Sequence, residues 1–190
     1  MNERCGWAGP DPVYIAYHDE EWGVPLRDGR ALWELLVLEG FQAGLSWITI
    51  LKKRPAFRAA FQGFEPARIA RWGEPDVARC LADPGIVRHR GKIEAAIAGA
   101  RAWLEIEARE GFAGFVWDSV DGRPVQNAWT RPEDVPAATP ASERLSRRLR
   151  AEGFRYCGPT IAYAFMQAAG LVNDHLVTCP RHAEVARLSG

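Results

Sequence analysis

The sequence predicts an all-α fold in one domain. Apolar residues recur at helical spacing in several segments, and Pro, Ser or Thr stands where those segments begin. We find no internal repeat and no run that alternates apolar and polar residues over the length of a strand. With 47% apolar and 25% charged residues, the 190-residue chain can bury a sizeable core. We therefore expect a single helical domain over residues 1–190.

The clearest helical pattern covers residues 30–41, where leucines form one stripe and Glu39 lies near the end. A second helix is expected to begin with Ser46 as its N-cap and to end in a basic run, which suits a helix C-terminus. Pro55 is then expected to open a separate short helix that ends at Phe61.

Proline also marks the next helix starts. Pro66 and Pro75 should each open a helix, the first reaching about Trp72 and the second about Ala82. The longest helix is expected over residues 91–107. Its apolar face is predicted to consist of Ile93, Ile97, Ala100 and Leu104.

The following part of the chain mixes helices with one long connection. A short aromatic helix is expected over residues 112–119, and then an exposed connection over residues 121–140, which is rich in Pro, Thr, Asn and Gly. Thr139 before Pro140 predicts the start of another helix, and Gly153 is its expected C-terminal glycine.

Residues 153–160 join that helix to a following apolar segment by a tight turn that contains glycine. A helix, a short glycine hairpin and a second helix make the pattern of a helix-hairpin-helix element, here over about residues 142–170. The free backbone amides of such a hairpin and of the helix after it can hold one phosphate. An ordinary corner between two helices has the same pattern, and the pattern alone does not separate the two.

Charge and hydropathy limit the kinds of partner. The net charge is zero, whereas a non-specific nucleic-acid binder is usually basic overall, so nucleic-acid contacts would need local basic groups. Two such groups lie in residues 88–92 and 144–155, and composition favours the simpler interpretation that they are solvated helix faces. No segment can span a bilayer, and the N-terminus lacks the apolar core of a signal peptide. We expect a cytoplasmic protein without membrane contact.

Potential metal ligands lie at both ends of the chain: Cys5, His18, His175 and Cys179. Two thiolates and two imidazoles make a tetrahedral set suited to zinc, and the spacing of the last two would place them on one face of a helical turn. Such a site would join the terminal segments 1–25 and 171–181. Cys80 and Cys157 have no neighbouring ligand and are expected to be buried thiols.

Aromatic residues are concentrated near the N-terminus. The chain has eight tryptophans, and those of its first quarter include Trp7, Trp22 and Trp47, which lie close in sequence to other aromatic residues, namely Tyr14, Tyr17 and Phe41. Aromatic side chains usually belong to a core. Beside Glu39 and the first two potential metal ligands, they could instead wall a pocket for a flat ligand.

Several long segments together resemble one known family: ERCGW at 3–7, YIAYHDEEWGVP at 14–25, LEGFQAGLSWITILKKR at 38–54, GIVRHRGKI at 85–93 and YAFMQAAGLVNDH at 163–175. The sequence closely resembles the 3-methyladenine DNA glycosylase I family, constitutive bacterial alkylation-repair enzymes of the helix-hairpin-helix glycosylase superfamily. The match runs in order from about Glu3 to Cys179 and covers nearly the whole chain.

The resemblance implies one structural Zn²⁺ per chain, held by the four Cys and His ligands. It assigns Glu39 to recognition of the damaged base, because a buried carboxylate can balance the positive charge of the base and accept a hydrogen bond from its amino group. The aromatic residues are implied to enclose the extruded base by cation–π contact: Tyr14, Tyr17 and Trp47 directly, and Trp7 and Trp22 as outer walls.

The resemblance also implies contacts with DNA. Gln42 and Gly44 belong to a loop that approaches the space left by the flipped nucleotide. Leu45 is the residue expected to wedge between base steps, with core packing as the alternative. The hairpin residues expected to contact DNA are Arg155, Tyr156, Gly158 and Thr160.

The implied reaction is hydrolysis of the N-glycosidic bond of a flipped N3-methyladenine in double-stranded alkylated DNA. It releases free 3-methyladenine and leaves an abasic site; whether 3-methylguanine is also released stays open. The hairpin and the next helix contain no lysine that could form a Schiff base, so a monofunctional enzyme without lyase activity is expected. We expect a monomer in which Asp174 is structural or supports the ligand His175, and in which His182 is a tail residue.

Two alternatives remain open. In a zinc hydrolase, Glu39 would act as general base on a metal-bound water, which requires one of the four ligands to be absent from the metal. In a non-enzymatic DNA-binding module, the hairpin would bind DNA and zinc would only join the chain ends. Binding of phosphate needs no enclosed aromatic pocket, which argues against the second alternative.

Overall fold

The computed structural model describes residues 4–188, and the chain is mainly helical, as the sequence predicts. The α-helices are α1 (Pro12–Glu20), α2 (Gly29–Gln42), α3 (Trp47–Ala60), α4 (Pro66–Ile69), α5 (Glu74–Ala82), α6 (Arg90–Arg109), α7 (Phe112–Trp117), α8 (Pro140–Ala151), α9 (Pro159–Ala168) and α10 (Pro180–Arg187). Short 3-10 helices lie at Gly6–Ala8, Gln62–Phe64, Asp118–Val120 and Pro132–Asp134. Strands β1 (Val125–Gln126) and β2 (Val172–Asn173) form one parallel pair.

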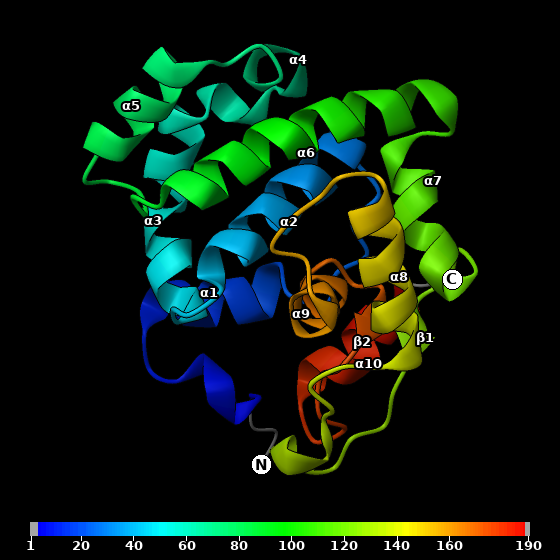
Figure 1. The fold of residues 1–190 in the computed structure, drawn as a ribbon. Helices are drawn as coiled ribbons and strands as arrows, with labels where there is room; N and C mark the ends of the chain where they lie inside the picture. Colours follow the sequence, from blue (N-terminus) through cyan, green and yellow to red (C-terminus); the bar gives the residue numbers. More distant parts are fainter. Residues whose placement is uncertain (1–3, 189–190) are drawn as a thin grey trace.

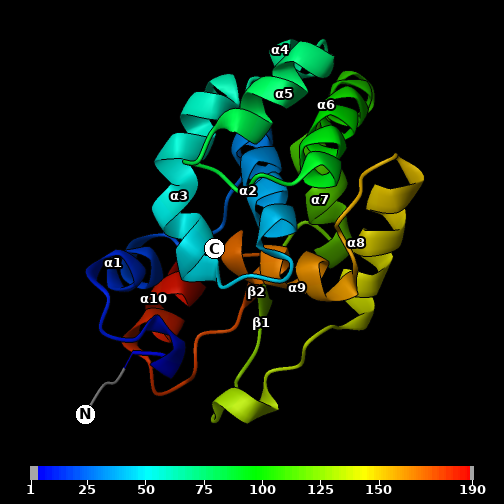
Figure 2. The same cartoon turned by 60° about the vertical axis from the view of Figure 1, so that its left-hand side comes forward.

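Helix α2 lies in the middle of the fold, in contact with α3, α6, α7 and α9 (Figures 1 and 2). A helix that is covered on several sides must be apolar around much of its circumference. The buried apolar residues of α2 meet this requirement: Leu32, Trp33, Leu36, Leu38 and Phe41. The predicted helix over residues 30–41 is therefore confirmed, and it is the central element of the core.

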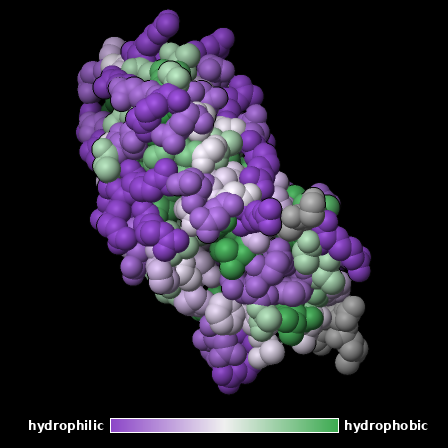
Figure 3. All heavy atoms as spheres, turned by 90° about the vertical axis from the view of Figure 1, so that its right-hand side faces the viewer, coloured by the Kyte–Doolittle hydropathy of each residue, from purple (hydrophilic) through white to green (hydrophobic). Residues whose placement is uncertain are grey.

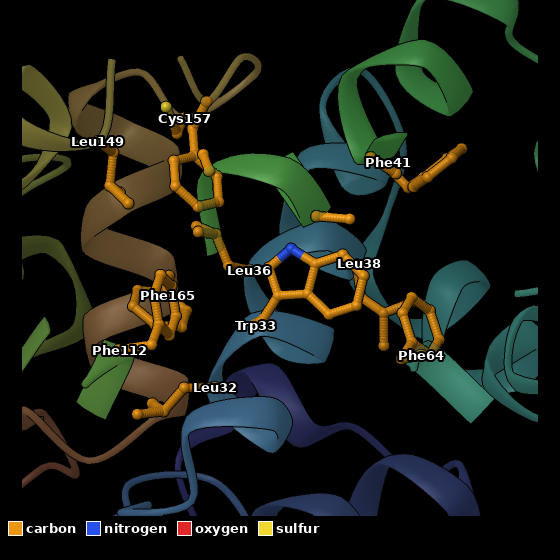
Figure 4. Packing of buried hydrophobic residues seen from close by; sticks show 14 of the residues in the cluster. Leu32, Trp33, Leu36, Leu38, Phe41, Phe64, Phe112, Leu149, Cys157 and Phe165 are labelled. Atoms are coloured by element: carbon orange, nitrogen blue, oxygen red, sulfur yellow. The ribbon is translucent and has the colours of Figure 1, made fainter. Parts of the chain in front are cut away.

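The core extends to both sides of α2 (Figure 4). On one side Phe165 of α9 and Phe112 of α7 lie near the start of α2. On the other side the ring of Trp33 meets Phe64 edge-on, with centroids 6.0 Å apart. Each fully buried side chain of this size stabilises the fold by about 1.5–3 kcal/mol, so α2 is held from both directions.

Helix α3 differs from the prediction at Pro55. The helix runs without a break from Trp47 to Ala60, and Pro55 lies inside it rather than at the start of a new helix. An interior proline loses one hydrogen bond and crowds the preceding turn, at a cost of about 3 kcal/mol. Burial of Phe57 beside Phe41, with ring centroids 4.8 Å apart, offsets that cost, and such packing cannot be read from local sequence.

Most other predicted helix starts are confirmed. Pro66 and Pro75 stand in the first turns of α4 and α5, although α4 ends at Ile69 and a turn replaces its expected last residues. Thr139 caps α8, because its side chain accepts a hydrogen bond from the backbone N–H of Ser142. On α6, the predicted apolar face is buried except for Leu104, which is 36% exposed.

The basic segment at the start of α6 also differs from its expected place on a solvated face. Lys92 is buried, with 7% of its surface exposed, whereas Arg88 and Arg90 are exposed. The thiols of Cys80 and Cys157 are buried, as predicted.

The expected exposed connection over residues 121–140 is more ordered than predicted. Its residues Val125 and Gln126 form β1 and pair in parallel with Val172 and Asn173 of β2. The sequence showed no strand pattern because the strands are only two residues long, too short for alternation to be recognised. The pairing attaches this connection to the segment that follows α9.

The terminal segments meet around α1 and the start of α10: the N–H of Leu176 donates to Cys5 Sγ at 3.4 Å, and the Sγ of Cys179, the residue before α10, lies 3.6 Å from Nε2 of His18 in α1. Neither helix was predicted, although Asp11 caps α1 through its side chain and Pro12 follows in the first turn. Gly170 allows a close approach in this region. It has a φ of +71°, and a Cβ there would lie 2.5 Å from the carbonyl carbon of Val24.

Helix α10 begins at Pro180, so the segment after Cys179, in which His182 was expected to be a tail residue, is helical. In the face that Figure 3 shows, hydrophilic side chains predominate and hydrophobic ones form small, separate groups. No helix among residues 4–188 is both long and apolar enough to cross a membrane.

Candidate functional site

A cavity of about 470 Å³ opens between the N-terminal segment, α1, α2 and α9. Its walls are formed by Cys5, Gly6, Trp7, Tyr14, Tyr17, Trp22, Glu39, Gln42, Trp47, Pro132, Val135, Pro136, Ala164, Gln167, Asp174 and Leu176. The tryptophans and tyrosines that the sequence suggested for a pocket are among them, and so is Glu39, whereas Phe41 is buried in the core instead. The structure thus brings together the predicted pocket residues, which come from three separate segments of the chain.

Trp7 lies at the centre of the aromatic wall. Its ring centroid is 5.0 Å from that of Tyr14, 4.9 Å from that of Trp22 and 6.3 Å from that of Tyr17. Tyr17 continues the wall to Trp47, at 5.7 Å. The rings are tilted or edge-on, an arrangement that the aromatic quadrupole favours. Trp7 is 37% exposed and Tyr17 only 4%, so the wall extends from the surface into the interior.

Glu39, near the end of α2, is a buried acidic group. It is 4% exposed, and within residues 4–188 no donor or cation pairs with its carboxyl group. Burial raises the pKa of Glu39 from 4.5 to about 8, because the charged form is poorly solvated there. At neutral pH the free protein therefore holds this carboxyl group mainly in its neutral form.

Two tyrosine hydroxyls share this environment. The pKa values of Tyr14 and Tyr17 are raised above the ordinary value for tyrosine. Burial is the main cause, and the charge of Glu39 is the second. Both hydroxyls remain protonated near neutral pH and can donate hydrogen bonds.

The opposite wall comes from the connection before α8, which contributes Pro132, Val135 and Pro136. We did not predict this wall, since proline-rich, polar segments usually indicate a solvent-exposed loop. Asp174 holds the connection in place. Its Oδ1 accepts hydrogen bonds from Asn127 Nδ2 at 2.6 Å and from Trp129 Nε1 at 2.8 Å.

The second oxygen of Asp174 binds to helix α9. Oδ2 accepts hydrogen bonds from the Tyr163 hydroxyl at 2.6 Å and from Gln167 Nε2 at 2.8 Å. The buried carboxylate thus has donors on both oxygens, as a buried charge requires. Asp174 and Gln167 both line the cavity, so this group of hydrogen bonds joins two of its walls.

Behind the aromatic wall the four predicted metal ligands meet. All four are buried, and their ligand atoms lie within 4.8 Å of one another. Cys179 Sγ is 3.6 Å from His18 Nε2 and 3.8 Å from His175 Nδ1, and Cys5 Sγ is 3.7 Å from His175 Nδ1. A tetrahedral zinc ion with ordinary bond lengths would separate sulfur and nitrogen ligands by about 3.5 Å, so the residues fit this ion.

Hydrogen bonds orient both imidazoles for metal binding. His175 Nε2 donates to the carbonyl oxygen of Trp22 at 3.0 Å, and His18 Nδ1 donates to Asp19 Oδ1 at 2.8 Å, which leaves the other ring nitrogen of each histidine free to bind a cation. Arg4 donates hydrogen bonds to Asp19, and this interaction is the main reason that the pKa of the Asp19 carboxyl group is lowered to about 2. Burial lowers the pKa of His175 to about 4, which favours the neutral imidazole.

The predicted metal site differs from the prediction in its local backbone, and the structure also locates His182. His175 and Cys179 share a turn that is not helical, although their ligand atoms do converge. His182 is outside this group: its ring nitrogen Nε2 lies 2.7 Å from the carbonyl oxygen of Asn127.

The predicted DNA-contacting residues lie in two neighbouring parts of the fold: the end of α2 with the turn after it, and the turn before α9 with the start of that helix. Leu45 is 41% exposed in the turn after α2, so it is not part of the core, and Gly44 there has a φ of +85°. The amide of Gln42 donates to the carbonyl oxygen of Leu45 at 2.5 Å. Gln42 itself also lines the cavity.

The second turn joins α8 and α9. Gly158 is the residue before the first turn of α9, and Thr160 lies within that turn. Arg155 and Tyr156 are exposed on it. A Cβ placed on Gly40 would lie 3.4 Å from Tyr156 Cβ, so this turn packs directly against the end of α2 that carries Glu39.

These features define what the cavity can bind. Its aromatic walls suit a flat ring, and its unpaired carboxyl group can accept a hydrogen bond or compensate a positive charge. A model of the methyladenine glycosylase family matches residues 7–182. The chain belongs to this family.

Relatives from this family are similar to this chain over nearly the full length of both proteins. DNA-3-methyladenine glycosylase 1 of Escherichia coli (strain K12) is 53% identical over 178 residues, which are 93% of this chain and 95% of that protein. A crystal structure of 3-methyladenine DNA glycosylase I has a TM-score of 0.92 at 55% identity and covers 94% of this chain and 98% of that one. A crystal structure of a substituted 3-methyladenine DNA glycosylase I in complex with 3-methyladenine has a TM-score of 0.90 at 41% identity. It covers 95% of this chain and 97% of that one.

The first prediction concerns the Cys/His cluster. Cys5→Ala should remove bound zinc, measured by elemental analysis of the purified protein, and lower the free energy of unfolding by about 3 kcal/mol or more. Cys80→Ala is the matched control, since it also truncates a buried thiol but lies outside the cluster. Equal zinc content in both variants would refute the assignment.

The second prediction concerns Asp174. Trp129→Phe removes one donor to this carboxylate and should lower stability by about 1–2 kcal/mol. It should also weaken ligand binding in the cavity, because the wall formed by residues 132–136 loses an attachment. Trp103→Phe removes a comparable bond, from Nε1 to the carbonyl oxygen of Gly29, far from the cavity, and should leave binding unchanged. Calorimetric titration that shows equal affinity in both variants would contradict this role.

The third prediction uses the pKa of Glu39. The folded protein binds this proton more tightly than the unfolded chain does, so the wild type loses stability as the pH rises from about 4.5 to about 8. Glu39→Gln has no such loss and should be more stable than the wild type above pH 8, by about 2 kcal/mol, with little difference near pH 4. Glu105→Gln, on the exposed face of α6, should change stability by less than about 0.5 kcal/mol. A stability difference between Glu39→Gln and the wild type that is independent of pH would argue against a buried, proton-binding carboxyl group.

Proposed function

We propose that this protein removes N3-methyladenine from alkylated double-stranded DNA by hydrolysing its N-glycosidic bond, with free 3-methyladenine and an abasic site as products. The chain is a hydrolase of the methyladenine glycosylase family. The observation that carries the proposal is the cavity, in which Glu39 lies unpaired among aromatic walls.

The charge of the damaged base explains its recognition. A 3-methylated adenine in DNA carries a delocalised positive charge, whereas adenine is neutral. In the free protein Glu39 is mainly protonated, because burial raises its pKa to about 8. A cationic base in the cavity stabilises the ionised carboxylate, which then accepts a hydrogen bond from the exocyclic amino group. A neutral base offers no such compensation, so the cost of a buried charge acts against undamaged adenine.

The aromatic walls add to this selection. Tyr14, Tyr17 and Trp47 line the same cavity as Glu39, and a cation over an aromatic face gains about 0.5–2 kcal/mol. Trp7 and Trp22 form the outer wall and connect it to the Cys/His cluster, since the ring of Trp22 lies 4.6 Å from that of His175. A flat purine extruded from the duplex fits this chemistry.

Cleavage of the bond needs little acid catalysis, because the methylated base already leaves as a neutral molecule. The protein extrudes the base, holds it and lets water reach C1′ as positive charge develops on the sugar. Residues 153–170 contain no lysine that could attack C1′ and form a Schiff base. We infer a monofunctional glycosylase that leaves the DNA strand intact.

The turn between α8 and α9 is the phosphate-binding part of the proposed helix-hairpin-helix element. The first N–H groups of a helix have no partner within the helix, and Gly158 brings the backbone close to that end of α9. Arg155 and Tyr156 flank it and Thr160 adds a hydroxyl group at the helix start. Leu45, exposed on the neighbouring turn, is the proposed wedge between base steps, with Gln42 and Gly44 shaping that turn.

We assign zinc to the Cys/His cluster as a structural ion that joins residues 1–25 to residues 171–181 and positions the aromatic wall. Four protein ligands complete a tetrahedral site, so no open position remains for a reactive water. Glu39 is not part of this group, which weighs against a zinc hydrolase. A protein that only binds DNA would not need a cavity of this kind. We further propose that the protein acts as a cytoplasmic monomer.

The fourth prediction tests the function itself. Wild-type protein incubated with methylated duplex DNA should release 3-methyladenine, identified by chromatography, and should not cleave the strand at the abasic site. Glu39→Gln should lower the rate of release by roughly 10- to 100-fold, since it removes a charge-assisted hydrogen bond. Its affinity for undamaged duplex should stay the same.

Glu105→Gln is the control, and it should release the base like the wild type. Titration with free 3-methyladenine should quench tryptophan fluorescence to saturation in the wild type. An absence of both base release and quenching would disprove the proposed function and favour a zinc hydrolase or a DNA-binding module.

A further inference from the structure

Lys92 is a buried cation outside the cavity and the Cys/His cluster. It is 7% exposed, and no carboxylate among the described residues pairs with it. Its Nζ donates to the carbonyl oxygen of Phe41 at 2.9 Å and to that of Ala43 at 2.7 Å. Lysine is almost never buried without a partner, and here both partners are main-chain atoms at the end of α2.

The position of Lys92 is unfavourable for its own helix. It lies in the first turn of α6, where the helix dipole disfavours a positive charge. The same charge is favourable at the C-terminus of α2, where the last carbonyl groups lack partners. Lys92 therefore serves α2 and the turn after it rather than α6.

The turn after α2 depends on this contact. Ala43 leaves the helical region with φ −49° and ψ 115°, Gly44 has a φ of +85°, and the N–H of Leu45 donates to the carbonyl oxygen of Gln42 at 2.7 Å. Lys92 holds the carbonyl groups of Phe41 and Ala43, which lie on either side of the last residue of α2. Without it, two polar groups would lose their partner and the conformation of the turn would be less restricted.

The turn between α8 and α9 packs against the same place. The ring of Tyr156 lies 5.8 Å from Lys92 Nζ. A Cβ on Gly40 would lie 3.4 Å from Tyr156 Cβ, and a Cβ on Gly91 would lie 2.7 Å from the Tyr156 hydroxyl. Tyr156 thus packs against two glycines, Gly40 of α2 and Gly91 of α6, and has an unusual φ of +56°, a conformation that persists where surrounding structure supports it.

We propose that Lys92 is a positioning residue for DNA: it holds the turn with Leu45 and the turn with Tyr156 as one rigid unit, so that the wedge and the phosphate-binding amides meet the duplex in a set geometry. The inference rests on the proposed function. It concerns engagement of DNA and not the chemistry of the cavity, because the contacts of Lys92 are with main-chain atoms beyond Glu39.

Lys92→Met tests this role. It should lower kcat/KM on methylated duplex by about tenfold or more, since small displacements of positioning groups have such effects. Its Kd for free 3-methyladenine should stay within about twofold of the wild type, which also shows that the variant is folded. Lys92→Arg, which keeps the charge and donors, should recover most of the loss. In a Leu45→Ala background Lys92→Met should cause a smaller further loss, because both changes act on the same turn.

Lys53→Met is the matched control. Lys53 Nζ likewise donates to two main-chain carbonyl groups, those of Pro84 and Gly85, at 3.2 and 3.1 Å. This variant should release 3-methyladenine from DNA like the wild type. An equal loss in both variants, or a loss of free-base affinity that matches the loss of excision, would show that Lys92 only supports the fold.

Hydrogen exchange of the free protein separates the inference from the proposed function. Amides of residues 43–46 and 155–157 should exchange faster in Lys92→Met than in Lys53→Met. Unchanged exchange there disproves the role of Lys92 even if the wild type excises the base. A wild type that releases no base disproves the proposed function alone. If Lys92→Met does not fold, Lys92→Gln, which keeps one donor, is compared with Lys92→Arg in the same measurements.

Discussion

The burial of α2 is the constraint on which the rest of the structure depends. Other helices cover this helix on several sides, so a carboxyl group near its end is removed from water together with the surrounding leucines. Glu39 has no partner among the described residues, and its pKa is raised to about 8 as a result. The free energy needed to ionise it becomes available only when a cation enters the cavity. Under the proposed function, selectivity for a charged base is thus a property of the core as much as of the cavity wall.

The aromatic wall belongs to two structures at once. Trp7 contacts Tyr14 on the cavity side and His18 on the side of the Cys/His cluster, with a centroid distance of 5.3 Å to the latter. Trp22 similarly packs on His175. A displacement of the ligands would therefore move the rings that face the base. The cluster can influence recognition without contact between a metal and the base, because the same side chains are packed on both sides.

Local signals in the sequence were sufficient for most helices, since Thr139 with Pro140, or Pro75 after Gly73 and Glu74, act within one turn of the chain. The pocket aromatics and the Cys/His ligands stood out by residue type and position, and the long motifs of the resemblance then assigned their roles. What could not be predicted depends on distant contacts. Pro55 stays inside a helix because of the aromatic packing around it, and Lys92 is buried because another helix ends beside it. The wall formed by residues 132–136 depends on hydrogen bonds with Asp174, about 40 positions further along the chain.

The order of the chain has a consequence for synthesis of the protein on the ribosome. The cavity joins Trp7 and Tyr14 to Asp174 and Leu176, and Cys5 meets His175 across 170 positions of sequence. Contacts of such separation form late, because a long loop must close before they stabilise anything. A nascent chain can bury α2 among α3 to α7 while the cavity is still incomplete. The cavity is therefore completed only in the last stage of translation, and a chain that stops before residue 174 lacks part of its wall.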